Sequence, residues 1–309
     1  IHDVAGDALA IRGSTHVAVE DNVVRGSAIS VQSGSANVTL QRVDLANTSN
    51  SGVRVFGLPQ PADTPSASRP LFVVRDSHIH SIGKGEASDF GAIYVAPSDL
   101  QCWSGNRSCD ASALVANNVV HGVRAKRYGA NGIYLDDAAS AVSVSQNLVY
   151  DTGSAAIYAH CGTTQNISDN VFALNNVIDG RAPFQGCDPG GYSPPGFLPT
   201  SRAVARRNVI AASGAAAIAG ATPDTRQWAD RANSTAFDFN LYASSSGALS
   251  FPPVPGMAFA RWQASGEDAN SILAVVAGFA NASASDFRLL PTSPARRHLG
   301  VKQPDYASM

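Results

Sequence analysis

The stretch GANGIYLDDAASAVSVSQNLVYDTGS, residues 129–154, is followed directly by AAIYAHCGTTQNISDNVFALNNVID, residues 155–179, and the two segments share one pattern. Ile133 recurs as Ile157, and Asn147 recurs as Asn170. The first segment holds two short alternating runs, IYL and VSV, and then a turn with asparagine before a third run, LVY. Self-similarity of this kind is the mark of a repeat protein.

The same apolar position recurs toward the N-terminus. It is occupied in order by Ile29, Val53, Ile93, Ile133 and Ile157, at intervals of 24, 40, 40 and 24 residues. The two intervals of 40 residues exceed the others by 16, so these two coils carry insertions of about 16 residues. Three short strands in about 22–25 residues cannot bury a face alone, but stacked coils bury a continuous core. The sequence therefore predicts an all-β fold, a right-handed parallel β-helix with loop insertions.

The period ends after residue 235, which divides the chain into two parts. We expect the β-helix over residues 1–235 and an irregular tail of strands and loops over residues 236–309. Such a tail would cap the C-terminal end of the solenoid and block pairing of its open edge. The N-terminal end shows no such cap, and we expect further coils upstream of Ile1.

An asparagine recurs at one position of the coil. The members of this set are Asn22, Asn118, Asn147, Asn170 and Asn208. Asparagine tolerates left-handed turn geometry, and its amides can stack from coil to coil. We interpret these asparagines as structural.

Charge and hydropathy exclude two classes of partner. The 309 residues include 22 Lys and Arg against 24 Asp and Glu, which gives a formal net charge of −2. This balance lacks the basic surface that nucleic acids require. No run approaches the roughly 18 apolar residues that a membrane-spanning helix needs. We expect a monomer with no nucleic-acid partner and no membrane insertion.

Cysteines and glycosylation sequons indicate a secreted protein. Cys102 and Cys109 bracket a short polar loop, and Cys161 and Cys187 bracket a stretch rich in glycine and proline. Both spacings suit local disulfides, although four reduced cysteines in a cytosolic protein are the alternative. Six N-x-S/T sequons occur, at Asn37, Asn47, Asn106, Asn166, Asn233 and Asn281. An extracellular or cell-wall location is the expectation.

Strand alternation places two columns of side chains on the outer surface. The first column is Arg54, Tyr94, Tyr134 and Tyr158, and the second is Phe56, Ala96, Asp136 and His160. Neighbouring coils lie about 4.8 Å apart, so Asp136 and His160 should be in contact. Aromatic faces beside charged groups suit a carbohydrate chain lying along the solenoid.

Each of these residues also has a structural interpretation. The tyrosines would stabilise the sheet as cross-strand pairs, Asp136 and Asp137 would end a strand in a turn, and His160 would be an ordinary surface imidazole. A glycosidase, however, needs two carboxyl groups across the scissile bond. Asp136 or Asp137, together with Asp89 just before the Tyr94 strand, provides such a pair.

Three segments resemble a known family. SDFGAIY, NGIYLDDAASAVSVSQNLVYDTGSAAIYAHCG and DFRLLPTSPA are similar to β-helix proteins of the pectate-lyase-like superfamily, and within it to glycoside hydrolase family 141. That family's pattern S-D-x-G-G-I-Y, G-I-Y-x-D-[DE]-G-S-S and H-x-H-Y-G falls on Asp89, Asp136, Asp137 and His160. The resemblance implies an enzyme acting on plant-type polysaccharides. The chain departs from the pattern at Ala92, Ala138, Ala139, Tyr158 and Cys161.

We therefore expect an extracellular glycoside hydrolase. Asp136 or Asp137 with Asp89 would be the catalytic carboxylates, His160 would orient a hydroxyl, and Tyr94, Tyr134, Tyr158 and Arg54 would bind the polysaccharide. The alternatives are a polysaccharide lyase or epimerase and a non-catalytic binding or structural solenoid. No cofactor and no metal site is expected, and Ca²⁺ between Asp136, Asp137 and Asp89 is the one alternative.

Overall fold

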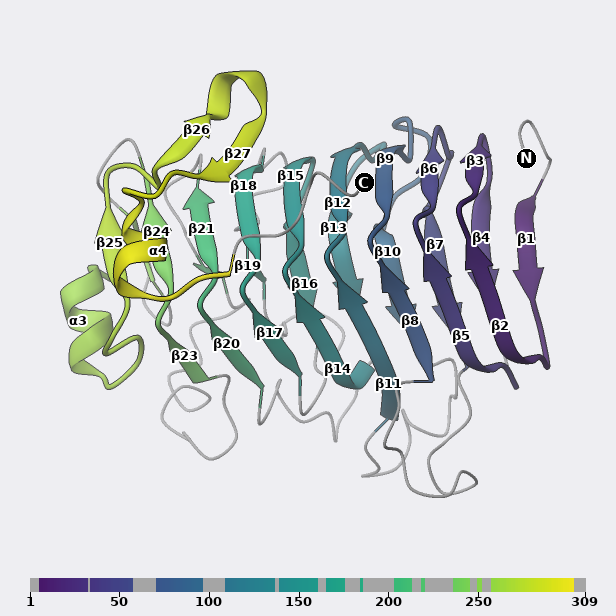
Figure 1. Cartoon of the computed structure of the whole chain (residues 1–309), viewed down its shortest axis with the longest axis horizontal. Helices are drawn as coiled ribbons and strands as arrows, with labels where there is room; N and C mark the ends of the chain where they lie inside the picture. Colours follow the sequence, from purple (N-terminus) through teal and green to yellow (C-terminus); the bar gives the residue numbers. More distant parts are fainter. Residues whose placement is uncertain are drawn as a thin grey trace.

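The computed structural model describes residues 6–32, 34–57, 71–96, 109–136, 139–160, 165–175, 184–185, 203–212, 218–219, 236–244, 249–251 and 257–302. Three long parallel sheets wind through these residues, each taking one strand from every coil (Figure 1). The predicted all-β parallel β-helix is confirmed.

The first sheet carries the two columns expected from the sequence. In spatial order it consists of β1 (Asp7–Ile11), β4 (Ala28–Val31), β7 (Val53–Phe56), β10 (Phe90–Ala96), β13 (Ala130–Leu135), β16 (Ile157–Ala159), β19 (Phe184–Gln185) and β22 (Ile218–Ala219). Ile29 pairs with Val53, Val53 with Ile93, and the ladder continues through Ile133 to Ile157. The uneven intervals read from the sequence are therefore the true register.

The second and third sheets complete each coil. The second consists of β2 (Thr15–Glu20), β5 (Ala36–Gln41), β8 (Phe72–Arg75), β11 (Cys109–Ala116), β14 (Ala139–Ser145), β17 (Asn166–Ser168), β20 (Val204–Arg206) and β23 (Ala236–Asp238). The third consists of β3 (Val23–Arg25), β6 (Asp44–Ala46), β9 (His78–Ile82), β12 (Val119–Val123), β15 (Leu148–Thr152), β18 (Val171–Asn175), β21 (Val209–Ala212), β24 (Leu241–Ala243) and β25 (Ile272–Ala274). Valine, isoleucine and leucine from all three sheets fill one continuous core.

A ladder of buried asparagines joins the coils between the second and third sheets. The side-chain oxygen of Asn147 accepts the backbone N–H of Asn118 at 3.0 Å, and that of Asn170 accepts the N–H of Asn147 at 2.9 Å. Asn208 and then Asn240 continue the series. Stacking of the amides is thus confirmed, although the sequence analysis missed Asn240.

Two details of the asparagine prediction are wrong. Asn22 is exposed and donates to the Glu20 carbonyl instead of joining the ladder. The left-handed residue is also not the asparagine but the one before it, such as Gln146 with φ 56° or Asp169 with φ 58°. The asparagine that follows each of these two residues is buried.

The C-terminal residues pack in two places. Helix α3 (Phe259–Ala264) inserts Trp262 into the main core at the end of the solenoid. The segment with η3 (Ala282–Ala284), the hairpin of β26 (Phe279–Asn281) and β27 (Asp286–Leu289), and α4 (Pro294–His298) lies instead on the outer face of the third sheet. There Phe287 and Leu289 pack against Val171 and Val209 in a second apolar cluster.

The division at residue 235 stays a prediction, but the sheets do not stop there. Strands β23, β24 and β25 extend the second and third sheets beyond it.

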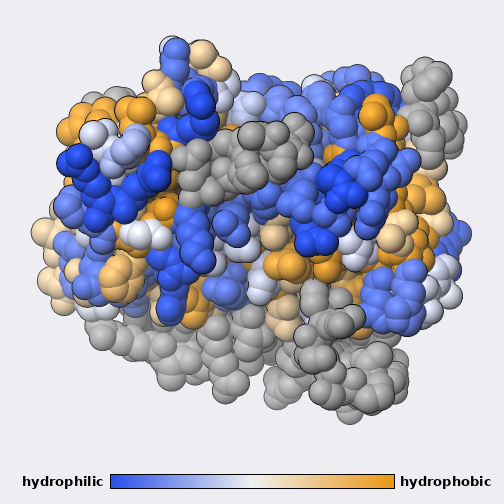
Figure 2. Space-filling model, in the orientation of Figure 1, coloured by the Kyte–Doolittle hydropathy of each residue, from blue (hydrophilic) through white to orange (hydrophobic). Residues whose placement is uncertain are grey.

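In the view of Figure 2, hydrophilic residues cover much of the middle of the molecule. Among the described residues, none of the helices combines the length and apolar character that a membrane crossing demands.

Candidate functional site

The first predicted column is formed as expected. Arg54 of β7 pairs with Tyr94 of β10, which pairs with Tyr134 of β13 and through it with Tyr158 of β16. The residues on either side of each tyrosine point into the core. Parallel pairing in register therefore stacks the column on the opposite, outer side of the sheet.

Asp136 lies at the centre of a hydrogen-bonded group just beyond β13. The Tyr94 hydroxyl donates to Asp136 Oδ2 at 2.6 Å, and His160 Nδ1 lies 2.7 Å from Asp136 Oδ1. The backbone explains this meeting, because the Asp136 N–H binds the Val95 carbonyl and the His160 N–H binds the Leu135 carbonyl. The ladder thus continues past the last strand residues and aligns the two side chains in successive coils.

The carboxylate fixes the orientation of the imidazole. An ionised carboxylate only accepts hydrogen bonds, so His160 Nδ1 carries the proton that points to Asp136. In the neutral ring the lone pair is then on Nε2. The side chain of His160 is 19% exposed, and that of Asp136 is 11% exposed. The arrangement leaves the Nε2 lone pair on a partly exposed imidazole that is held by a buried carboxylate.

Tyr134 and Tyr158 differ from the expectation. Strand alternation places them on the outer side of the sheet as sugar platforms, whereas they are only 4% and 5% exposed. Their rings stack on each other with centroids 4.7 Å apart and planes 13° apart, and they pack with Ala155 in a small cluster outside the main core. Stacking between adjacent coils covers the ring faces. Their role in binding sugar stays a prediction.

The surroundings of Tyr134 keep its hydroxyl protonated. Burial raises its pKa well above the usual value, and the charges of Asp136 and Asp89 raise it further. A phenol in this state can donate a hydrogen bond, but it cannot serve as a base near neutral pH.

Asp89 lies before β10, whereas Asp136 follows β13. The backbone of Asp89 is left-handed, with φ 60°, and the Asp89 N–H donates to the Tyr128 carbonyl. A side chain at Gly129 would come within 2.6 Å of the Asp89 α-carbon, so this turn packs tightly on the next coil. The charges of Asp136 and Asp89 act in the same direction on Tyr134, since both raise the pKa of its hydroxyl.

Arg54 is engaged at the N-terminal end of the column. It forms an ion pair with Asp7 of β1, and its side chain is 30% exposed. The neighbouring Phe56 packs against Tyr94 with ring centroids 5.4 Å apart. Arg54 therefore borders the tyrosine group but already holds a carboxylate of its own chain.

Several predicted residues lie outside the described residues. These are Asp137, Cys102, Cys161 and Cys187, and of Cys109 only the backbone at the start of β11 is described. The disulfides and the role of Asp137 therefore stay predictions. The same holds for a Ca²⁺ site between Asp136, Asp137 and Asp89.

One functional candidate was missed altogether. His78, His80 and His121 meet on the outer face of the third sheet. The signal was present as the pair His78-x-His80, with His121 one coil later. Sequence spacing alone does not bring His121 beside this pair, because an insertion separates the coils and only the pairing of β9 with β12 aligns them.

Comparison with known proteins gives distant structural likeness only. No protein-family model matches the chain, and no curated protein matches its sequence. The A-module of mannuronan C-5 epimerase AlgE4 from Azotobacter vinelandii is similar over 78% of this chain and 50% of its own, with 13% identity and a TM-score of 0.40. The A-module of AlgE6 from the same organism is similar over 89% of this chain and 58% of its own, with 12% identity and a TM-score of 0.45. The chain thus spans little more than half the length of these modules.

Proposed function

We propose that the protein is an enzyme that removes a proton from a sugar carbon next to a carboxylate in an acidic polysaccharide, as a lyase or a C-5 epimerase. The observation that carries the proposal is Asp136, held between the Tyr94 hydroxyl at 2.6 Å and His160 Nδ1 at 2.7 Å. This group unites a base, the carboxylate that orients it and a hydroxyl that can return a proton.

His160 Nε2 is the proposed general base. It takes the proton from C5 of the uronic acid, and the electron pair left behind spreads onto the sugar carboxylate. Asp136 stabilises the imidazolium that forms. An epimerase then returns a proton to the opposite face of C5, whereas a lyase breaks the C4–O bond and protonates the departing oxygen. Tyr94 is the proposed donor in either case: its hydroxyl turns from Asp136 to the substrate as it gives up the proton. The phenolate then regains a proton from the His160 imidazolium through solvent, which restores both residues.

A positive charge near the sugar carboxylate would assist this step. Arg54 stands one strand before Tyr94 in the same column and is the proposed partner for that carboxylate. Its contact with Asp7 would then be shared with the substrate. Buried Tyr134 and Tyr158 would support the site from beneath rather than bind sugar rings.

The same contacts favour this chemistry over glycoside hydrolysis, which the sequence analysis ranked first. A glycosidase directs two carboxyl groups at the scissile bond. Here both oxygens of Asp136 are already in hydrogen bonds, and the residue is 8% exposed. A carboxylate held in this way is suited to positioning a neighbour rather than to attacking a sugar. A polymeric substrate also fits an extracellular or cell-wall location, which we propose together with a monomeric state.

The test uses alginate-type, pectate-type and neutral xylan-type polysaccharides with three readouts. Ultraviolet absorbance detects unsaturated sugars, a reducing-end assay detects chain cleavage, and NMR in D₂O detects exchange at C5. We expect exchange or absorbance on an acidic polymer and its loss, by a factor of about 100 or more, in His160→Gln. The control is His16→Gln, an exposed histidine on the second sheet.

Two results would overturn the proposal. New reducing ends without unsaturation, lost in Asp136→Asn, would identify a glycoside hydrolase instead. Binding of a polysaccharide without any reaction, unchanged in His160→Gln, would identify a non-catalytic solenoid.

A further inference from the structure

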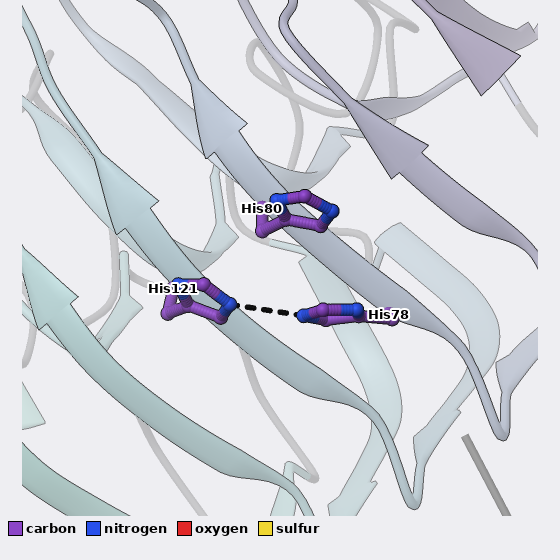
Figure 3. Close-up of side chains that lie close together, drawn as sticks. All are labelled: His78, His80 and His121. Carbon is purple, nitrogen blue, oxygen red and sulfur yellow. Dashed lines mark hydrogen bonds between the residues drawn. The ribbon is translucent and has the colours of Figure 1, made fainter. Parts of the chain in front are cut away.

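Three histidines gather on the outer face of the third sheet, away from the tyrosine column. His78 and His80 are two residues apart on β9 and therefore point to the same side of the strand. His121 of β12 pairs directly with His80. One ligand nitrogen from each of the three lies within 4.8 Å of the others (Figure 3).

The closest contact joins two imidazoles. His78 Nε2 and His121 Nε2 are 2.9 Å apart, so one nitrogen carries a proton and the other presents a lone pair. Tetrahedral zinc holds imidazole nitrogens at about 2.0–2.1 Å, which separates them by about 3.3 Å. Small rotations of these two rings would therefore replace the shared proton by a metal ion.

A carboxylate stands behind the histidines in the manner of many metal sites. Asp44 Oδ1 lies 3.2 Å from His80 Nε2 and 3.9 Å from His78 Nδ1. Metal-bound imidazoles commonly direct their second nitrogen to such a carboxylate, which fixes the ring. His78 thus has one nitrogen near Asp44 and the other at His121. Burial opposes the charge of Asp44, but its hydrogen bond to Arg25 holds the pKa of the carboxyl below the usual value.

Two of the imidazoles are buried enough for their charged forms to be disfavoured. Burial, followed by the nearby His78 and His80, lowers the pKa of His121 to about 4. Burial likewise lowers the pKa of His78.

The cluster borders an open cleft. His78, Val119, Leu148 and Tyr150 form one side of a cleft of about 390 Å³, and residues 284–288 of the C-terminal segment form the other. Tyr150 stacks on His121 with ring centroids 4.6 Å apart, and its ring centroid lies 4.8 Å from that of Phe287. A small ion or molecule can reach His78 from this cleft.

We propose that His78, His80 and His121 bind one divalent transition-metal ion, with Zn²⁺ the best match to three imidazoles and with a coordination position left toward the cleft. Three protein ligands with one open position are the pattern of catalytic rather than structural zinc sites. The alternative is a stack of imidazole rings that only supports the sheet, because His78 and His80 also lie face to face at 4.2 Å.

The test uses the untagged full chain freed of metal by a chelator. Zn²⁺ binding is measured by calorimetry, and Co²⁺ binding by its visible absorption, which reports tetrahedral nitrogen ligation. We expect one ion per chain, at least tenfold weaker binding in His121→Gln and in His78→Gln, and little change in the exposed His16→Gln control. Zn²⁺ should also raise the melting temperature of the wild type but not of His121→Gln.

Circular dichroism first confirms that both cluster variants fold. Should His121→Gln not fold, His80→Asn is measured in its place. Binding at more than one site with equal strength in all variants would overturn the proposal, as would the absence of Co²⁺ absorption in the folded wild type. In either case the histidines would be a stacked surface cluster, and the proposed function of the Asp136 group would be unaffected because it lies on another sheet.

Discussion

Asp136 and His160 are 24 residues apart in the chain, yet their side chains meet at 2.7 Å because they occupy the same position in successive coils. Each owes its place to a backbone hydrogen bond that continues the ladder of the first sheet beyond its last strand residue. The contact is therefore a direct product of the register.

If the two residues act as a unit, their substitutions should not add. We predict that His160→Gln and Asp136→Asn each lower kcat/KM on the acidic substrate and that the double variant is no more than about threefold worse than the poorer single variant. Steady-state kinetics on all four proteins measures this. Losses that multiply would show that Asp136 contacts the substrate independently of His160.

Tyr94 and Tyr134 should differ in importance although they are neighbours in one column. Tyr94 donates to Asp136, whereas burial holds the pKa of Tyr134 far above neutral. We predict a loss of kcat of at least tenfold in Tyr94→Phe and a change of less than about threefold in Tyr134→Phe. Tyr150→Phe, on the third sheet, is the control. Equal losses in both column variants would refute the proposed role of Tyr94.

The asparagine ladder should contribute strongly to stability. Asn170 is fully buried, donates to the Val144 carbonyl and accepts the Asn147 N–H. Asn170→Ala leaves these partners unsatisfied, and we predict a loss of about 2–4 kcal/mol in the free energy of unfolding. Asn22→Ala, outside the ladder and exposed, should cost under about 1 kcal/mol. Urea denaturation followed by circular dichroism compares the two, and similar costs would contradict the structural role of the ladder.

Alanine substitutions at two nearby glycines distinguish the stability cost of backbone strain from the cost of a steric clash. Gly83 and Gly85 both have positive φ, 85° and 73°. A side chain at Gly83 would meet the Arg124 carbonyl at 2.3 Å, whereas at Gly85 nothing lies within 4 Å. We predict a cost of about 1–2 kcal/mol for Gly85→Ala from conformation alone and at least about 3 kcal/mol for Gly83→Ala. Thermal unfolding measures both, and the reverse order would contradict the packing at this turn.

Asp268 should make stability depend on pH in a defined direction. It is buried at the C-terminal end of the solenoid and accepts hydrogen bonds from Tyr242 and Trp262, each at 2.7 Å. Burial nevertheless raises its pKa, although the hydrogen bonds, Ser271's first, oppose the shift. The folded protein therefore retains a proton that the unfolded chain loses above the ordinary value of 3.8. Its contribution to stability falls as the pH rises from there through the raised pKa.

The variant Asp268→Asn removes this titration. We predict that the wild type loses stability relative to the variant as the pH rises from about 4 to 7, because only the wild type carries the titrating carboxyl. Urea denaturation at several pH values provides the measurement. A difference that stays constant would show that Asp268 titrates normally.

The sequence by itself determined the fold and part of the site. In a parallel β-helix, a position in the repeat becomes a position in space, because every coil pairs in register with the next. Matching Ile133 with Ile157 was therefore enough to bring Asp136 beside His160. It was also enough to predict the asparagine ladder, apart from its two ends.

Only the tertiary structure decided which outward residues are covered and which chemistry they suit. Tyr134 and Tyr158 are buried because rings of adjacent coils stack, and strand alternation carries no information about that. The cleft beside His78 exists because residues 284–288 fold back onto the third sheet from far along the chain. Register acts between neighbouring coils and can be read from the repeat, whereas exposure depends on segments that the repeat does not contain.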